Sequence, residues 1–129
     1  MITKENIDKI LCDTLYALAE GVGGGNIILK KINKKLPIKT AKLIIDSIDF
    51  DTIVSIFYEI GEIIEIDELN KECSSITNAG LLNMNFAVIT AKMEYNKLCI
   101  SAYAKEGLIN QHTCQKALNM IMCTINSME

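Results

Sequence analysis

The stretch from Thr77 to Met128 carries apolar residues at helical spacing, in two long runs separated by Gly107. Between residues 82 and 103, apolar side chains recur at alternating steps of four and three, and Asn96 is the one polar member of the series. A mostly polar series with nearly the same period runs beside it. Paired stripes of this kind are typical of a helix with one face in a core and one in water. Because Gly107 can take the left-handed conformation that ends a helix, we predict a long helical hairpin here.

Residues 84–105 also admit a second interpretation, in which Phe86–Thr90 and Cys99–Tyr103 are strands of a hairpin. Its turn would use Glu94–Lys97, which contains neither Gly nor Pro, whereas short hairpins usually need Asn-Gly, Asp-Gly or a similar pair. Alanine, methionine, leucine and lysine in this stretch favour a helix. We therefore prefer the helix and keep an α+β fold with a hairpin at 84–105 as the alternative.

Shorter helices are predicted in the first half of the chain. Thr3 can cap the first, Pro37 suits the first turn of another, and Asp49 or Asp51 can cap the next. The acidic stretch 62–73 is interpreted as a separate helix or as the continuation of the one before it. These elements complete an all-α bundle of six or seven helices that ends in the long helical hairpin.

The composition indicates one compact domain over residues 1–129. Half of the residues are hydrophobic, which is enough for a core and argues against disorder. No apolar run approaches the ~18–20 residues that span a bilayer, and the N-terminus shows no signal-peptide core. Five cysteines, an odd number without framework spacing, are typical of reduced thiols. We therefore predict a cytoplasmic protein that does not contact a membrane.

Charge is unevenly distributed along the chain. Residues 1–43 carry a net charge of +4, residues 44–76 carry −8 and the remainder +1. The basic segment could bind an anion or a partner, although it lacks aromatic residues that would stack on bases. Its candidate residues are Lys30, Lys31, Lys34, Lys35, Lys39 and Lys42. If residues 51–73 form one helix, four acids share a face that could meet a basic partner: Glu59, Glu62, Glu65 and Glu72.

No spacing in the chain indicates a metal site or catalytic machinery. His112 and Cys114 would point roughly 200° apart on a helix, and Cys123 would lie ~13.5 Å from Cys114 along it. A tetrahedral zinc needs all of its ligands at ~2.0–2.3 Å. The glycine-rich segment 21–25 is followed by Lys30 too late to form a phosphate loop. We therefore predict no cofactor, no metal and no catalytic residue, and enzymatic activity stays uncertain with the balance against it.

The predicted function is that of a non-catalytic interaction protein: a small regulator, adaptor or immunity-type inhibitor that docks to an unidentified protein partner. One alternative is a nucleic-acid-associated protein that uses residues 30–42. Another is a small-ligand carrier or an enzyme with an apolar pocket between helices.

A homodimer is a further expectation. A helix from Asn78 to Glu106 would be ~43 Å long, whereas a compact chain of this length has a diameter of roughly 36 Å. Such a helix needs another chain to cover its apolar end, and the 4–3 spacing suits helix-on-helix packing. The expected seam is Leu82, Phe86, Ile89, Met93, Asn96, Ile100 and Tyr103.

Overall fold

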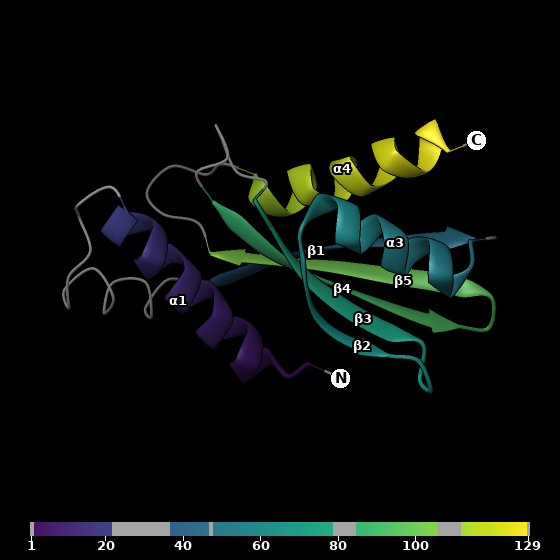
Figure 1. Cartoon of the computed structure of the whole chain (residues 1–129), viewed down its shortest axis with the longest axis horizontal. Coiled ribbons are helices and arrows are strands. Elements are labelled where there is room, and N and C mark those ends of the chain that lie inside the picture. The colour runs from purple at the N-terminus through teal and green to yellow at the C-terminus, as the bar shows by residue number, and fades with distance from the viewer. Residues whose placement is uncertain (1, 22–36, 47, 79–84, 106–111, 129) are drawn as a thin grey trace.

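The computed structural model describes residues 2–21, 37–46, 48–78, 85–105 and 112–128, and these form three helices and five strands (Figure 1). In chain order they are α1 (Lys4–Gly21), β1 (Ile38–Asp46), α3 (Phe50–Ile60), β2 (Glu62–Asp67), β3 (Glu72–Asn78), β4 (Phe86–Glu94), β5 (Lys97–Lys105) and α4 (Thr113–Ser127). The strands make one antiparallel sheet in the order β1-β5-β4-β3-β2.

The fold is therefore α+β, and the prediction of an all-α bundle with six or seven helices is wrong. Residues 86–105, predicted as most of one long helix, are instead the hairpin of β4 and β5, which is the alternative interpretation. The segment after Pro37 is β1 rather than a helix, and the acidic stretch 62–73 contains β2 and the start of β3. The helix on which the homodimer seam depended does not exist.

The β4–β5 turn explains why the hairpin forms without Gly or Pro. Tyr95 and Asn96 both have positive φ, 51° and 65°. Two successive residues with positive φ give the tight turn whose twist matches that of the flanking strands. Asn is one of the few non-glycine residues that enters this conformation readily. The objection to a hairpin was wrong because Asn96 supplies what glycine usually supplies.

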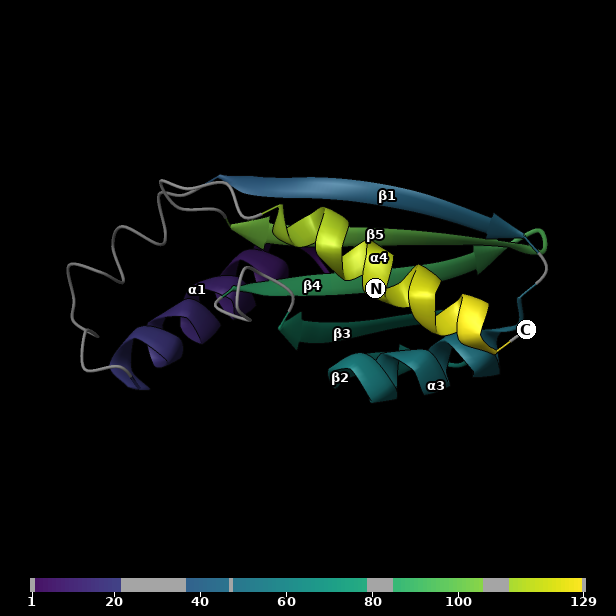
Figure 2. The same ribbon diagram turned by 90° about the horizontal axis from the view of Figure 1, so that it is seen from above.

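Two helices cover one face of the sheet, and α1 crosses the other (Figures 1 and 2). We call these the inner face, under α3 and α4, and the outer face. The main core lies between the inner face and the two helices, and β4 and β5 contribute alternate residues to it. Its fully buried members include Ile53, Phe57, Ile89, Ile100, Ala117 and Ile121. On the outer face, Ile7 and Leu11 of α1 pack against Val88.

Three of the predicted helices are confirmed. Thr3 Oγ1 accepts a hydrogen bond from Asn6 N at the start of α1. Asp49 caps α3, where its Oδ1 accepts from Thr52 N at 2.8 Å. The second apolar run predicted as a helix is α4, which buries Cys114, Leu118, Ile121 and Ile125 and leaves the fifth member of the run, Met122, half-buried.

The C-terminal end of α3 is joined to β3 by buried hydroxyls. Ser75 Oγ donates to Glu62 O at 2.9 Å, and Thr77 Oγ1 donates to Ile60 O at 2.6 Å. The last carbonyls of a helix lack intrahelical partners, so Thr77 satisfies one of these orphan acceptors. The two hydroxyl groups on the inner face of β3 therefore have a structural role, because both donate hydrogen bonds to backbone carbonyls.

Candidate functional site

Three hydroxyl side chains lie side by side across the middle of the outer face. Ser74 on β3 is in register with Thr90 on β4, and Thr90 is in register with Ser101 on β5. Their neighbours along each strand belong to the core on the inner face, so strand alternation turns all three toward the outer face. We call these three residues the hydroxyl row. The same register continues to both edges of the sheet, with Glu65 on β2 and Lys42 on β1.

Two further rows flank the hydroxyl row, each about 7 Å away because residues on one strand face repeat every second position. On one side is a charged row, in which Glu72, Lys92 and Cys99 pair across β3, β4 and β5. On the other side is an apolar row of Ile76, Val88 and Tyr103, which packs under α1.

The small side chains of the hydroxyl row leave a hollow between the two flanking rows. Its volume is about 220 Å³. The end beneath α1 is lined by Ile2, Ile7 and Tyr103, and the open end by Glu72, Lys92 and Cys99. We call this hollow the groove. An engineered cavity of ~150 Å³ in another protein is large enough for benzene, so the groove has room for a small organic molecule.

Ser74 Oγ lies in the lining of the groove and is buried, with the residue only 3% exposed. Among the described residues it is a buried side-chain oxygen without a hydrogen-bond partner. Such a group costs roughly 1–3 kcal/mol, and native proteins contain few of them. Ser75, its neighbour in the chain, donates from its hydroxyl to backbone carbonyls of Phe57 and Glu62 on the inner face. The unsatisfied oxygen therefore occurs at the groove and not as a general feature of β3.

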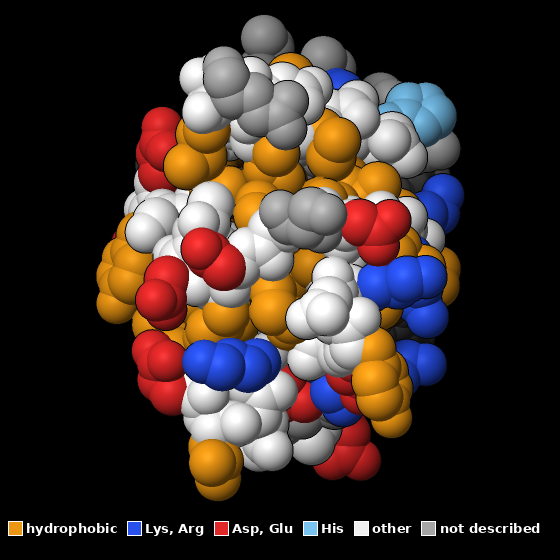
Figure 3. All heavy atoms as spheres, turned by 90° about the vertical axis from the view of Figure 1, so that its right-hand side faces the viewer, with side chains coloured by type: hydrophobic (Ala, Val, Ile, Leu, Met, Phe, Trp, Pro, Cys, Tyr) orange, Lys and Arg blue, Asp and Glu red, His pale blue; other side chains and the backbone are white. Residues whose placement is uncertain are grey.

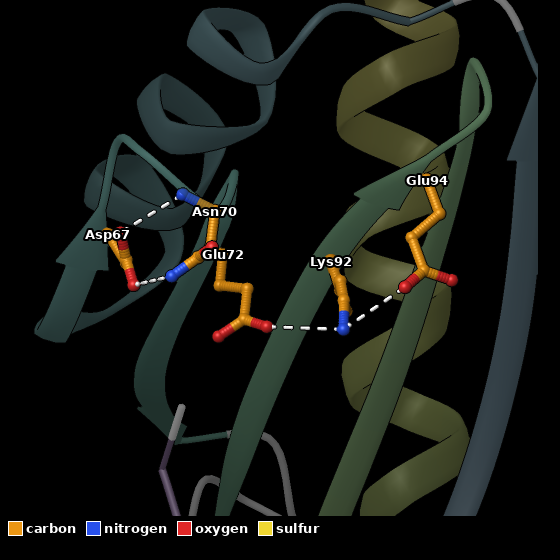
Figure 4. A network of polar contacts seen from close by, with 5 residues as sticks. All are labelled: Asp67, Asn70, Glu72, Lys92 and Glu94. Atoms are coloured by element: carbon orange, nitrogen blue, oxygen red, sulfur yellow. Dashed lines mark hydrogen bonds and ion pairs between the residues drawn. The ribbon is translucent and has the colours of Figure 1, made fainter.

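The charged row is held in place by a network of polar contacts (Figure 4). Lys92 Nζ lies 3.1 Å from Glu94 Oε1 and 3.4 Å from Glu72 Oε1. The hydrogen bond and charge of Glu94, followed by those of Glu72, raise the pKa of Lys92 above its usual value. The ammonium group therefore stays protonated at the mouth of the groove.

The β2–β3 turn beside this network has its own polar clamp. Asp67 Oδ1 accepts from Asn70 N at 3.1 Å, and Asp67 Oδ2 accepts from Asn70 Nδ2 at 2.8 Å (Figure 4). These hydrogen bonds lower the pKa of the Asp67 carboxyl group. The clamp fixes the turn directly before Glu72, and so it fixes the acidic side of the groove.

The uneven charge of the sequence is also uneven in space. At the end of the sheet seen in Figure 3, most lysines lie toward the right, whereas acidic side chains lie along the left and also at the right and the bottom. The predicted acidic face is nevertheless not one helix face, because Glu59 is on α3, Glu62 and Glu65 are on β2, and Glu72 is on β3. Only Glu65 and Glu72 of this set line the groove.

The predicted basic set is only partly within the described residues. Lys30, Lys31, Lys34 and Lys35 lie outside them. Lys39 and Lys42 are both exposed on β1, and their odd separation places them on opposite faces of the strand.

The predicted dimer seam is distributed over a hairpin. Leu82 lies outside the described residues, and Asn96 is in the β4–β5 turn. Ile89 and Ile100 are fully buried in the core of one chain. The remaining members, Phe86, Met93 and Tyr103, are half-buried on β4 and β5.

None of the five cysteines takes part in a disulfide bond. Burial raises the pKa of the Cys73 thiol to about 12, so that thiol stays protonated. Cys114 Sγ donates to Lys39 O at 3.2 Å, and Cys99 and Cys123 are exposed on opposite sides of the sheet.

His112 is exposed at the start of α4. Within the described ranges, no group of three or more His, Cys, Asp or Glu side chains is placed to hold a metal ion.

Sequence reasoning missed the hydroxyl row. Thr90 and Ser101 belong to the mostly polar series that was interpreted as the water-facing side of a helix, and Ser74 lies directly after the acidic stretch 62–73, outside both predicted helical runs. Thr90 and Ser101 alternate with apolar neighbours on their own strands, which is a usable signal, whereas Ser74 is followed by the polar Ser75. Their meeting depends on the strand register, which no local pattern specifies.

Comparisons with protein-family models, with curated proteins and with solved structures found no match to this chain. None of the described helices is both long enough and apolar enough to cross a membrane.

Proposed function

We propose that the protein binds a small molecule in the groove and acts as a carrier or sensor of that molecule. The observation that supports this most directly is Ser74 Oγ, which is buried without a partner in the lining of a hollow of about 220 Å³. The free protein already bears the cost of desolvating this oxygen. A ligand that donates or accepts a hydrogen bond there gains affinity without a new desolvation cost on the protein side.

The rows around the groove define the class of ligand. An apolar part would lie against Ile7 and Tyr103, and a hydrogen-bonding part would lie on the hydroxyl row, between those side chains and Lys92. Ligand sites commonly combine apolar walls with a few placed polar groups. The ligand is therefore a small amphipathic molecule with at least one hydroxyl, amide or carbonyl group.

This proposal takes up the predicted small-ligand carrier, but its pocket lies between α1 and the sheet instead of between helices. Docking to a protein partner and nucleic-acid association through residues 30–42 both stay predictions. A cytoplasmic location is part of the proposal, because five cysteines without a disulfide bond suit a reducing compartment.

The test is a screen of small amphipathic compounds by ligand-observed NMR and thermal shift, at millimolar concentration. We expect binders whose contacts map to the hydroxyl row. Thr90→Leu should abolish binding, because the larger side chain occupies the hollow. Ser55→Leu is the matched control, since Ser55 is exposed on α3, on the other side of the sheet.

Two results would overturn the proposal. One is the absence of any binder in the screen. The other is binding that survives in Thr90→Leu with unchanged affinity, which would place the ligand elsewhere.

A further inference from the structure

Among the described strands, β1 forms one edge of the sheet and pairs with β5 alone. It is nine residues long, and its register with β5 is regular from end to end. The opposite edge strand, β2, has six residues and an irregularity between Ile63 and Glu65. Bulges and short lengths protect an edge against pairing with another chain. Of the two edges, β1 is therefore the one that offers a regular template.

The side chains at the end of β1 are self-complementary. Ile44 is 65% exposed on the outer face, although it is a large apolar residue on a strand. Lys42 and Asp46 stand two residues before and after it on the same face. When two copies of this strand run antiparallel and side by side, the cation of each copy lies opposite the anion of the other, and the two apolar residues lie opposite each other.

We propose that a second copy of this chain pairs with β1, edge to edge and antiparallel, about a two-fold axis beside Ile44. In this register Ile44 lies opposite the Ile44 of the second copy. Lys42 of each copy then lies opposite Asp46 of the other, which gives two ion pairs by symmetry. On the inner face, Leu43 lies opposite Ile45.

Neighbouring registers lack this match. A pair centred on Lys42 places that cation opposite its own copy, and like charges directly opposite are unfavourable. A pair centred on Leu43 places Lys42 opposite Ile44 and leaves Asp46 without a basic partner across the strand. A slip by an odd number would bring outer-face residues opposite inner-face residues.

The covering helices leave this part of the edge open. Cys114, at the start of α4, contacts the Lys39 end of β1 through its Sγ–H. From there α4 runs diagonally away from β1 toward α3 (Figure 2). Toward its Asp46 end, β1 therefore diverges from α4, and a second sheet can continue the first at this edge.

The paired assembly would be a ten-stranded sheet whose two grooves open on the same side. A single pair of short strands buries less than the ~800 Å² per partner of a standard interface. We therefore expect a concentration-dependent dimer with micromolar affinity. The inference is independent of ligand binding in the groove.

The experiment is light scattering coupled to size exclusion, from micromolar to near-millimolar protein, on the full chain. The mass should rise with concentration toward twice 14.3 kDa. Ile44→Lys should remove the dimer, because it places two cations opposite each other at the axis. Leu69→Lys is the control, since Leu69 is 91% exposed in the β2–β3 turn and away from β1.

A charge swap separates this interface from any other. Lys42→Asp alone and Asp46→Lys alone should each weaken the dimer about tenfold or more, because each creates two like-charged pairs. The double variant Lys42→Asp/Asp46→Lys restores opposite charges and should restore the dimer. Circular dichroism confirms that each variant is folded. A monomer at every concentration, or a dimer that survives both Ile44→Lys and the single swaps, would overturn the proposal.

Discussion

Lys105 of β5 and Asp8 of α1 form an ion pair, with Nζ 2.6 Å from Oδ1, that joins helix α1 to the outer face of the sheet. The side chain of Lys105 is fully buried, whereas that of Asp8 is 41% exposed. Lys105 lies one row beyond Tyr103, next to the apolar row that α1 covers. This pair therefore helps to hold α1, one wall of the groove, against the sheet.

We expect Asp8→Asn to destabilise the protein by about 1–3 kcal/mol, because the buried ammonium group of Lys105 would lose the opposite charge of Asp8. Urea unfolding followed by circular dichroism measures the change. Asp13→Asn is the control, since Asp13 is an exposed acid on the same helix, and its effect should stay within about 0.5 kcal/mol. Equal effects at the two positions would mean that the ion pair does not hold α1 in place.

Gly61 separates α3 from β2 at a point where the backbone of β3 approaches closely. A Cβ on residue 61 would clash with the backbone oxygen of Ile76. We expect Gly61→Ala to destabilise the protein by about 1–3 kcal/mol or more, because a backbone carbonyl cannot give way as a side chain can. Thermal unfolding provides the measurement. Glu59→Ala, an exposed change two residues earlier, should be nearly neutral, and a neutral Gly61→Ala would contradict the close approach.

The cap of α3 predicts a dependence of stability on pH. The hydrogen bond from Thr52 lowers the pKa of Asp49 below its ordinary value of 3.8. A carboxyl group with a lowered pKa in the folded state stabilises the protein above its unfolded-state pKa, and that stabilisation is lost as the pH falls through the folded-state value. Stability should therefore decrease as the pH is lowered through and below 3.8.

The control for this prediction is Asp49→Asn, which can still cap the helix but does not titrate. Denaturant midpoints at neutral and acidic pH should differ less in the variant than in the wild type. An identical decrease in both proteins would assign the acid sensitivity to other carboxyl groups.

Local features, such as helix caps, were predicted from the sequence more accurately than the fold class. The caps at Thr3 and Asp49 and the helix formed by the second apolar run are confirmed, because capping and helical period depend on residues close in the chain. The fold class is wrong because a step of four residues keeps the same face in a helix and in a strand. Ile89 and Met93 satisfy both periods.

Burial on both faces of β4 added to the error. Ala87 and Ile89 are buried on the inner face, and Val88 is buried under α1 on the outer face. A strand that is covered on both faces loses the clean alternation that identifies it. The groove could not be predicted from the sequence either. It depends on the register of three strands and on where α1 crosses them.

The last prediction compares two neighbouring serines on β3. Ser75 Oγ donates to Glu62 O at 2.9 Å, so Ser75→Ala leaves a buried carbonyl short of a partner and should cost about 1–3 kcal/mol. Ser74 Oγ has no partner among the described residues, so Ser74→Ala removes an unsatisfied buried oxygen and should leave stability unchanged or raise it. Urea unfolding of the two variants, which differ from the wild type by one oxygen each, gives the comparison. In a binding assay with a groove ligand, the relative effects of the two variants should be reversed. Ser74→Ala should weaken binding, and Ser75→Ala should not. Equal destabilisation by both changes would show that Ser74 Oγ is satisfied in solution, by water for example, and would remove the main support for the groove as a binding site.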